Sequence, residues 1–271
     1  MTYSLGIDTE ETSKDAPELP VFPMSGIQGR RTLVVGGGSG IGRGIALAFG
    51  RLGAKVIVSD RELTQAEAVA QEITDEGGCA ASFFVDVADP SSVTKLRDDV
   101  FAALTSVDVV VHAAGIGSAS LTVDLTDEEW SQMIAVNLTG PFLITRAFLP
   151  HMMERRDGRV IIVSSQLGLI GASGLSHYCA AKSGVHGFVK SVAREVAEYN
   201  VLVNAIAPGP TDTPLLRLLP ADVRNGIRQD IPLKRIGTID EIVPTAVLLA
   251  SEGGSYYTGA VLSPCGGHAM P

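Results

Sequence analysis

The sequence TLVVGGGSGIGRGIALAFGRLG, residues 32–53, decides the fold of this chain. It opens with an apolar run typical of a buried strand, continues through a glycine-rich segment, and ends with apolar side chains at helical spacing. A strand, a glycine-rich turn and a helix in this order form the first half of a dinucleotide-binding βαβ unit. Gly36, Gly40 and Gly42 would permit a tight turn, the approach of a pyrophosphate to the backbone, and close helix–strand packing. The spacing Gly-x3-Gly-x-Gly differs from the G-x-G-x-x-G form, and an ordinary turn is the alternative.

The next apolar run ends in an acidic residue. The segment AKVIVSD (54–60) predicts a second strand, and Asp60 follows Gly42 by eighteen residues. A carboxylate at this place can accept hydrogen bonds from ribose hydroxyls and would repel a 2′-phosphate. Because a helical pattern follows at 63–73, a helix-capping role for Asp60 is the alternative. The neighbouring Arg61 would favour a phosphate, so the sequence predicts NAD over NADP without excluding NADP.

From there strands and helices alternate to the end of the chain. Further strands are predicted at 82–87, 107–115, 159–164, 201–209 and 259–264, with helices at 91–104, 127–153, 176–199 and 239–251. Seven strands interleaved with helices predict an α/β fold with one doubly wound parallel sheet and helices on both faces. Ligands bind such sheets outside the carboxyl ends of the strands. Asp86 and Val87, at the end of the third strand, would meet the edge and face of an adenine.

Composition narrows the function classes. The 271 residues are 45% hydrophobic, which is ample for one large core, and the net charge of −9 provides no basic surface for nucleic acid. Cys79, Cys179 and Cys265 are odd in number and far apart, so neither a disulfide framework nor a metal site is predicted, which fits a reducing cytosol. No apolar run of membrane-spanning length and no basic-then-apolar signal is found. We expect a soluble, cytoplasmic protein without membrane partners.

The first 28 residues differ from the rest. They are acidic, contain three prolines, and show neither a helical nor a strand period. We interpret residues 1–28 as an extension that is loose or packs along the surface. Residues 29–271 are then expected to form a single domain.

A candidate proton-transfer site lies in SQLGLIGASGLSHYCAAK, residues 165–182. Ser165 directly follows the apolar run 159–164, while Tyr178 and Lys182 are four residues apart and would share one face of a helix. An ammonium beside a phenol favours the phenolate, so the tyrosine could act as an acid or base near neutral pH. Ser165 could hydrogen-bond the same substrate oxygen. The alternative is a half-buried Tyr with a snorkelling Lys.

The motifs, taken together, resemble the short-chain dehydrogenase/reductase family over about residues 27–267. The resemblance rests on VGGGSGIG (35–42), HAAG (112–115), VNLTG (136–140), YCAAK (178–182) and APGPTDTP (207–214), with Ser165 thirteen positions before Tyr178. It implies a Rossmann fold and reversible hydride transfer between a nicotinamide cofactor and an alcohol or carbonyl. The order and spacing of the motifs make the match specific, although each motif is short.

The resemblance also implies roles for individual residues. Tyr178 would be the general acid/base, and Lys182 would lower its pKa and hold the nicotinamide ribose. Ser165 would polarise the substrate oxygen, and Asn137 would hold a water that links Lys182 to solvent. Together with the strand ends, the resemblance predicts that the cofactor contacts Gly36, Ser39, Gly40, Ile41, Gly42, Asp60, Arg61, Asp86, Val87, Ala113, Ala114, Gly115, Tyr178, Lys182, Pro208, Gly209, Thr211 and Thr213. For the two threonines, ordinary loop capping is the alternative to binding the carboxamide.

Three residues depart from the family pattern. Val35 stands where Thr is usual, His112 where the Asn of NAAG is usual, and Cys265 where an Asp is common near the C-terminus. The first two remove hydrogen bonds that brace the sheet around the cofactor, and the third concerns the packing of the last strand. We expect His112 to be a buried structural imidazole and not a catalyst.

The substrate-binding residues are predicted from the segments around the proton-transfer site. Leucines after position 213 would form an apolar flap, and leucines at 167–175 would line the opposite wall. The predicted substrate contacts are Gln166, Leu167, His177, Leu215, Leu216 and Leu219. They indicate a hydrophobic secondary alcohol or ketone. The alternative is that these leucines belong to the core or to a subunit contact.

Two other functions remain open at this stage. One is an NADP-dependent 3-oxoacyl-carrier reductase, which Asp60 and the lack of a basic patch disfavour. The other is a catalytically silent nucleotide-binding sensor, for which Val35 and His112 are the hints. The family resemblance also implies a homo-oligomer, most simply a tetramer. Its expected contact faces are the helices that carry Asn137 and Tyr178, and the 239–251 helix with the last strand.

Overall fold

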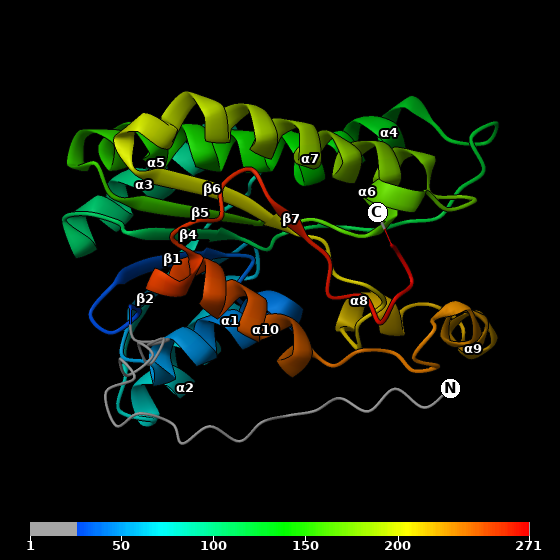
Figure 1. Ribbon diagram of the computed structural model, residues 1–271, viewed down its shortest axis with the longest axis horizontal. Coiled ribbons are helices and arrows are strands. Elements are labelled where there is room, and N and C mark those ends of the chain that lie inside the picture. The colour runs from blue at the N-terminus through cyan, green and yellow to red at the C-terminus, as the bar shows by residue number, and fades with distance from the viewer. Residues whose placement is uncertain (1–25, 271) are drawn as a thin grey trace, which may run out of the picture.

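The computed structural model of the protein describes residues 26–270. At its centre is a single seven-stranded parallel sheet in the order β3-β2-β1-β4-β5-β6-β7 (Figure 1). The strands are β1 (Arg31–Val35), β2 (Lys55–Asp60), β3 (Cys79–Phe84), β4 (Val109–His112), β5 (Gly158–Val163), β6 (Val201–Ile206) and β7 (Val261–Leu262). The chain reverses its direction across the sheet between β1 and β4, as in doubly wound folds. The predicted α/β fold is therefore confirmed.

Helices cover both faces of this sheet. One face carries α1 (Gly40–Arg51), α2 (Leu63–Asp75) and α10 (Ile239–Ala250), and the other carries α3 (Pro90–Leu104), α5 (Gly140–Arg155) and α7 (Ser176–Val196) (Figure 1). The shorter helices α4 (Asp127–Ile134), α6 (Leu167–Ile170), α8 (Pro214–Arg217) and α9 (Ala221–Asp230) lie toward the right of that view. α8 and α9 arise from the segment predicted as an apolar flap.

Successive side chains along each strand point to opposite faces of the sheet, so the core has two layers. Leu33 and Val35 pack with the α3, α5 and α7 layer, while Val34 between them packs with the α1, α2 and α10 layer. Strands that are buried on both faces need apolar side chains at every position, which explains the continuous runs in the sequence. Burying one such side chain stabilises the fold by roughly 1.5–3 kcal/mol.

Several elements differ from their predicted bounds: β4, β6 and β7 are shorter than predicted, and two further differences bear on the site. β3 ends at Phe84, where it pairs with Asp60, so 85–87 lie in a loop and not in a strand. The Asp86 backbone amide donates to the Ser92 hydroxyl at 2.9 Å, which draws this segment toward α3. The helix predicted over 127–153 is interrupted by a π-helical turn, η1 (Ala135–Thr139). Such turns often occur at functional sites, and this one carries Asn137.

The tract from α4 through α5 could be mistaken for a membrane-spanning helix by its length and composition. The helical tract Asp127–Arg155 is 29 residues long and apolar enough to cross a bilayer. An 18-residue stretch of it has a mean hydropathy of 1.3, and half of that stretch is buried inside the protein. In the structure α5 packs on β5 and α3. The tract is therefore a helix of the core, and its apolar side chains contact the sheet.

The amino-terminal end of the sheet is held by one buried carboxylate. Asp108 accepts hydrogen bonds from the Arg31 backbone amide at 2.9 Å and from the Arg31 and Arg155 guanidinium groups at 2.6–2.8 Å. These contacts lower the pKa of Asp108 from 3.8 to about 2, against the opposing effect of its burial. The Asp108 cluster lies at the opposite end of the strands from the glycine-rich turn.

The predicted extension lies mostly outside the described residues, which begin at position 26. Of the part that is described, Ile27 is buried in the layer beneath α1 and α10. The packed body therefore begins slightly before residue 29.

Candidate active site

The glycine-rich turn joins β1 to α1 and brings the backbone unusually close to the next loop. Gly36 has a φ of +76°, and a methyl group in place of its hydrogen would lie 2.3 Å from the backbone nitrogen of Ala114. At Gly42, an added methyl would lie 2.0 Å from the carbonyl oxygen of Gly36. Neither position tolerates a side chain, so the backbone itself forms this wall. The amino terminus of α1 opens beside it, which is the arrangement that binds phosphate groups.

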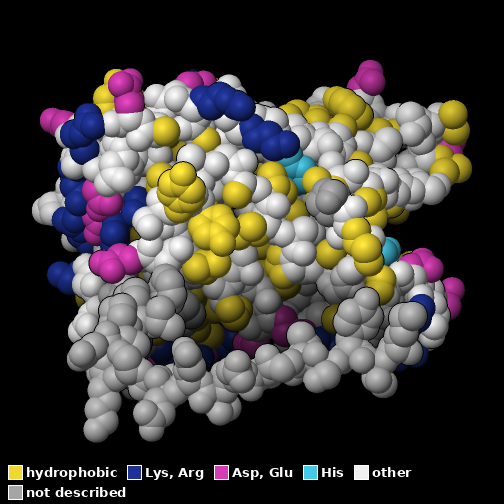
Figure 2. Space-filling model, in the orientation of Figure 1, with side chains coloured by type: hydrophobic (Ala, Val, Ile, Leu, Met, Phe, Trp, Pro, Cys, Tyr) yellow, Lys and Arg dark blue, Asp and Glu magenta, His cyan; other side chains and the backbone are white. Residues whose placement is uncertain are grey.

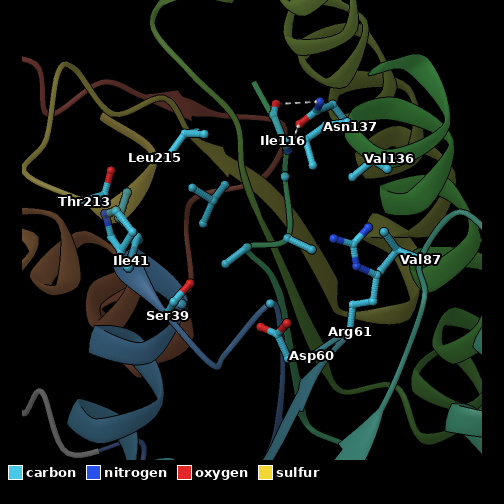
Figure 3. A pocket seen from close by; sticks show the side chains of 18 of the residues that line it. Ser39, Ile41, Asp60, Arg61, Val87, Ile116, Val136, Asn137, Thr213 and Leu215 are labelled. Carbon is cyan, nitrogen blue, oxygen red and sulfur yellow. Dashed lines mark hydrogen bonds between the residues drawn. The ribbon is translucent and has the colours of Figure 1, made fainter. Parts of the chain in front are cut away.

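The end of β2 places two opposite charges at the same cavity. The Asp60 carboxylate accepts hydrogen bonds from the backbone amides of Gly38 at 3.0 Å and Glu62 at 3.1 Å, so it is fixed against the glycine-rich turn. Figure 3 shows the Arg61 side chain extending beside Val87. The Arg61 side chain is 60% exposed, and its nearest acidic group, on Glu62, is 3.8 Å away. The carboxylate is thus held by two hydrogen bonds, whereas the guanidinium is exposed and weakly paired.

These groups line a cavity of about 260 Å³ at the switch point of the sheet (Figure 3). It is lined by the predicted residues Gly36, Ser39, Gly40, Ile41, Gly42, Asp60, Arg61, Asp86, Val87, Ala113, Ala114, Gly115, Tyr178 and Thr213. Sequence reasoning missed Ile116 and Val136, whose apolar side chains also face it. Of the other predicted cofactor contacts, Pro208, Gly209 and Thr211 line an adjoining cavity, and Lys182 lines neither.

Tyr178 and Ser165 meet where the two cavities join. Ser165 follows β5 and Tyr178 lies in the first turns of α7. The Ser165 hydroxyl accepts from the Leu167 backbone amide at 3.1 Å and lies near enough to the Tyr178 phenol to lower its pKa. Tyr178 lines both cavities. Burial raises the pKa of the Tyr178 phenol above 10.0, and the Ser165 hydrogen bond opposes this in part. The protein without ligands therefore holds the phenol protonated, whereas the sequence predicted that Lys182 would favour the phenolate.

Lys182 lies one helical turn below Tyr178 and is almost completely buried. Its Nζ atom donates to the Val163 carbonyl oxygen at 3.2 Å and lies 5.6 Å from the centre of the Tyr178 ring. Burial lowers the pKa of Lys182 from 10.5 to about 8. Burial is the largest influence on the pKa of both groups, and the stabilisation of the phenolate by Lys182 stays a prediction.

Asn137 is brought to the same place by the π-helical turn. Its Nδ2 atom donates to the Ile116 carbonyl oxygen at 3.0 Å, and its Oδ1 atom accepts from the Ile116 backbone amide at 3.3 Å. A methyl group on Gly115 would lie 2.8 Å from that Oδ1 atom and 3.5 Å from Lys182 Nζ. Asn137 therefore fixes the loop after β4 and lies near the lysine, as its predicted role requires.

The second cavity, of about 460 Å³, extends from Tyr178 between α6 and the α8–α9 segment. Its walls are mainly aliphatic, and it is lined by the predicted residues Gln166, Leu167, Leu215, Leu216 and Leu219. Sequence reasoning missed His268, near the C-terminus, which also lines it. In the sequence, His268 is marked only by its position after the paired glycines of CGGHAMP, and this segment is too short to predict a contact.

One predicted contact, His177, lies away from both cavities, and the two threonines line them with side chains that are engaged within their own loop. His177 is fully buried and lines neither cavity; its Nε2 atom is hydrogen-bonded to Ser118 at 3.0 Å, because the first turn of α7 directs it under the loop after β4. Thr211 donates to the Gly209 carbonyl oxygen at 2.9 Å. Thr213 accepts from the Leu216 amide at 3.3 Å and caps α8. Loop capping, the alternative considered for both threonines, is what their side chains do here.

The three departures from the family pattern lie close to the site. Val35 is buried in the core beside β4. His112 is 1% exposed, and neither ring nitrogen has a hydrogen-bond partner among residues 26–270; burial lowers its pKa to about 3. It is thus a neutral, buried imidazole, as expected. Cys265 exchanges hydrogen bonds between its Sγ atom and the backbone of Ala269.

Comparison with known proteins agrees with this geometry. The chain is 37% identical over 243 residues to the 3-oxoacyl-(acyl-carrier-protein) reductase FabG of Escherichia coli, covering 90% of this chain and 98% of that protein. It is 36% identical over 242 residues to the protein of the same name from Aquifex aeolicus, covering 89% and 98%. A crystal structure of a short-chain type dehydrogenase/reductase from Mycobacterium marinum superimposes with a TM-score of 0.88 at 33% identity, covering 92% of this chain and 98% of that one. The family described as short chain dehydrogenase matches residues 30–224, and the chain belongs to that family of oxidoreductases.

Proposed function

We propose that this protein reversibly transfers a hydride between a nicotinamide cofactor, NAD in preference to NADP, and a secondary alcohol or ketone with an apolar body. The observation that supports this most is the place of Tyr178, which lines both the cavity beside the glycine-rich turn and the aliphatic cavity. A proton donor at that junction can reach the oxygen of a substrate whose carbon lies against the cofactor.

The residues present fit a dinucleotide. The bare backbone at Gly36 and Gly42 leaves room for a pyrophosphate, and the amino terminus of α1 favours its charge. Asp60 is placed to accept hydrogen bonds from the adenosine ribose, and Asp86 and Val87 to contact the adenine. When bound, the nicotinamide supplies the hydride chemistry.

Each side chain around the junction has a separate role in the proposed proton transfer. Tyr178 gives a proton to a carbonyl oxygen, or takes one from a hydroxyl, while Ser165 holds that oxygen through its hydroxyl group. Lys182, charged below pH 8, stabilises the phenolate once a ligand excludes water from the site. Asn137 keeps the loop after β4 in place and lies beside the Gly115 backbone, where a water could connect Lys182 to solvent.

The preference for NAD rests on the fixed carboxylate at the end of β2. Two backbone amides hold Asp60 in place, so it cannot move aside for a 2′-phosphate, and two negative charges about 4 Å apart near a surface repel each other by roughly 4 kcal/mol. Arg61 offsets part of this because its guanidinium is weakly paired and lines the same cavity. The expected preference is therefore for NAD with residual use of NADP.

The names of the relatives support a second candidate, reduction of a 3-oxoacyl group on an acyl carrier protein. The first turn of α4 carries Asp127, Glu128 and Glu129, which would repel an acidic carrier that docked there. The net charge of −9 opposes such a partner as well. A small thioester would avoid this repulsion, so the substrate assay must include one.

The assay follows the absorbance of the reduced cofactor with NAD or NADP and a panel of secondary alcohols, ketones and acetoacetyl thioesters. Turnover of apolar ketones with NADH supports the proposal. Turnover restricted to thioesters with NADPH would favour the second candidate. No turnover of any panel member, together with normal cofactor binding, would indicate a nucleotide-binding protein without catalysis.

We also propose a cytoplasmic homo-oligomer, most simply a tetramer, with residues 29–271 as its single catalytic domain. Figure 2 shows hydrophobic side chains gathered on the face that carries β7 and α7. In the turn before β7, Tyr256 is fully exposed and Tyr257 is 37% exposed. An exposed apolar surface of this kind is typical of a subunit contact. Sedimentation of a monomer would contradict it.

A further inference from the structure

The C-terminal segment after β7 brings a second polar group to the aliphatic cavity. Figure 1 shows this segment leaving β7 and passing α8. Gly266 and Gly267 both have left-handed backbones, with φ values of +63° and +85°, and turn the chain sharply before His268. The side chain of His268 lines the cavity together with residues of α6, α8 and α9.

Hydrogen bonds between Cys265 and the two residues His268 and Ala269 hold this turn in place. The His268 backbone amide donates to the Cys265 carbonyl oxygen at 3.1 Å. The Cys265 thiol donates to the Ala269 carbonyl oxygen at 3.2 Å and accepts from the Ala269 amide at 3.4 Å. Cys265 is buried and packs against Gly209, where an added methyl group would lie 2.6 Å from the Cys265 Cα atom. The residue that departs from the family pattern therefore closes the turn that presents His268.

The imidazole itself is oriented by Gln166. The Gln166 amide nitrogen is hydrogen-bonded to His268 Nδ1, and the Gln166 side chain is 2% exposed. The Gln166 backbone amide donates to the Pro208 carbonyl oxygen at 3.1 Å, which fixes this residue beside Ser165. With the Gln166 amide nitrogen as the donor, Nδ1 accepts this hydrogen bond, and a neutral imidazole then carries its proton on Nε2. Nε2 has no partner among residues 26–270 and is free to donate.

Most other polar side chains of the cavity have partners or lie at its reacting end. Ser118 is bonded to His177, and Thr211 donates to the Gly209 carbonyl oxygen. The Thr213 hydroxyl accepts from the Leu216 amide and keeps its own O–H, but it lies at the junction with the first cavity, which it also lines. Ser165 and Tyr178 lie at the reacting end. Asp230 lines the cavity from the exposed end of α9. Away from that junction, His268 is therefore a free donor among the uncharged side chains that line this cavity.

We propose that His268, oriented by Gln166, is a substrate-binding residue that donates a hydrogen bond to a second oxygen of the substrate. This inference rests on the proposed function and narrows it: the substrate is an apolar ketone or secondary alcohol that also bears an ether, carbonyl or hydroxyl oxygen away from the reacting carbon. Because the walls of the cavity are aliphatic, this donor would discriminate strongly between substrates: one that lacks the second oxygen would leave the His268 N–H without a hydrogen-bond partner.

The test uses matched ketones that differ by one acceptor oxygen: 2-, 3- and 4-methoxycyclohexanone and the corresponding ethylcyclohexanones. For at least one pair, we expect the methoxy compound to have a kcat/KM about 10-fold higher in the wild-type enzyme, the value of one buried hydrogen bond. His268→Leu should reduce that ratio to about 1, mainly through KM. His268→Gln, which keeps an N–H donor, should retain part of it, and Met270→Leu, in the same tail, should leave it unchanged.

The same ketones are also titrated into the Tyr178→Phe enzyme saturated with reduced cofactor, with and without His268→Leu. This binding measurement does not depend on turnover. Preferential binding of a methoxy ketone that His268→Leu abolishes supports the site, even if the wild-type enzyme reduces none of them and the proposed function fails. Equal binding and equal kcat/KM within every pair, or preferences that both His268 variants retain, would overturn the inference.

Discussion

Lys182 provides the most stringent test of the site, because its contribution to stability and its contribution to activity should have opposite signs. Its ammonium group is buried and has one protein acceptor among residues 26–270, the Val163 carbonyl oxygen. Replacing it by the uncharged side chain of similar length in Lys182→Met should stabilise the cofactor-free protein and abolish turnover. Residues selected for catalysis often carry such a cost in stability.

The magnitude follows from the pKa. Burial lowers the pKa of Lys182 from 10.5 to about 8, a difference of about 2.5 pH units. At 1.36 kcal/mol per unit, holding the charged form costs about 3 kcal/mol at pH 7. Loss of the hydrogen bond to Val163 offsets about 1 kcal/mol of this in the variant. We therefore expect Lys182→Met to raise the free energy of unfolding at pH 7 by about 2 kcal/mol.

The sign of the pH dependence is equally specific. The unfolded chain binds more protons at Lys182 than the folded protein does between about pH 8 and 10.5, so the stability of the wild-type protein rises across that window. The advantage of the Met variant should shrink and then reverse as the wild-type lysine becomes neutral. Turnover should fall by about 10²–10⁴-fold, the usual contribution of acid–base catalysis.

Urea denaturation of the cofactor-free proteins at pH 7 and pH 10, at one protein concentration, measures both effects. Lys190→Met is the matched control, since Lys190 is exposed on the same helix and should change neither quantity appreciably. A Lys182→Met protein less stable than wild type at pH 7, or a stability difference equal at both pH values, would refute the account of a buried, destabilising ammonium.

Three further predictions concern single side chains. Tyr178→Phe should lower kcat by about 10²–10⁴-fold. Because burial raises the pKa of Tyr178, we expect kcat/KM for alcohol oxidation by the wild-type enzyme to rise with pH. Rate–pH profiles of the variant should lack this rise. Asp60→Ser should raise the NADP/NAD ratio of kcat/KM by about 10–100-fold, and an unchanged ratio would remove Asp60 from the ribose site. Asp108→Asn should lower the free energy of unfolding by about 2 kcal/mol at pH 7 and leave activity unaffected. The wild-type carboxylate stabilises the folded protein above about pH 3.8, and this contribution is lost as the pH falls toward 2. Denaturation curves at several pH values measure the effect.

The parts of this site that depend on backbone geometry were predictable from the sequence. Gly36 and Gly42 occupy places where any side chain would collide with backbone atoms, Gly36 with Ala114 of the loop after β4 and Gly42 with the Gly36 carbonyl oxygen, so the turn requires glycine at both positions. The alternation of apolar residues with helical segments likewise specified the sheet, because strands buried on both faces need apolar side chains at every position. β3 ends earlier than predicted because the chain leaves the sheet after Phe84, and the Asp86 backbone amide donates to Ser92 of α3.

The electrostatics of the site were harder to predict. Sequence spacing correctly placed Lys182 and Tyr178 one turn apart, but the direction of the phenol pKa depends on how much water reaches both groups. That quantity is set by the whole core beneath α7, including Val163 of the neighbouring strand. A pair at i and i+4 therefore indicates contact between the two side chains and leaves open which ionisation state the contact favours.

His268 shows how a site residue can escape both pattern and motif. Its position depends on two left-handed glycines and on the bond between Cys265 and Ala269, and its orientation depends on Gln166, 102 residues earlier. None of these contacts has a periodic signal in the sequence. The departure at Cys265 was visible, but its consequence, a closed turn that carries an imidazole into the aliphatic cavity, required the tertiary structure. The role proposed for His268 would place a determinant of specificity outside the motifs of the family, which would allow closely similar catalytic sites to serve different substrates.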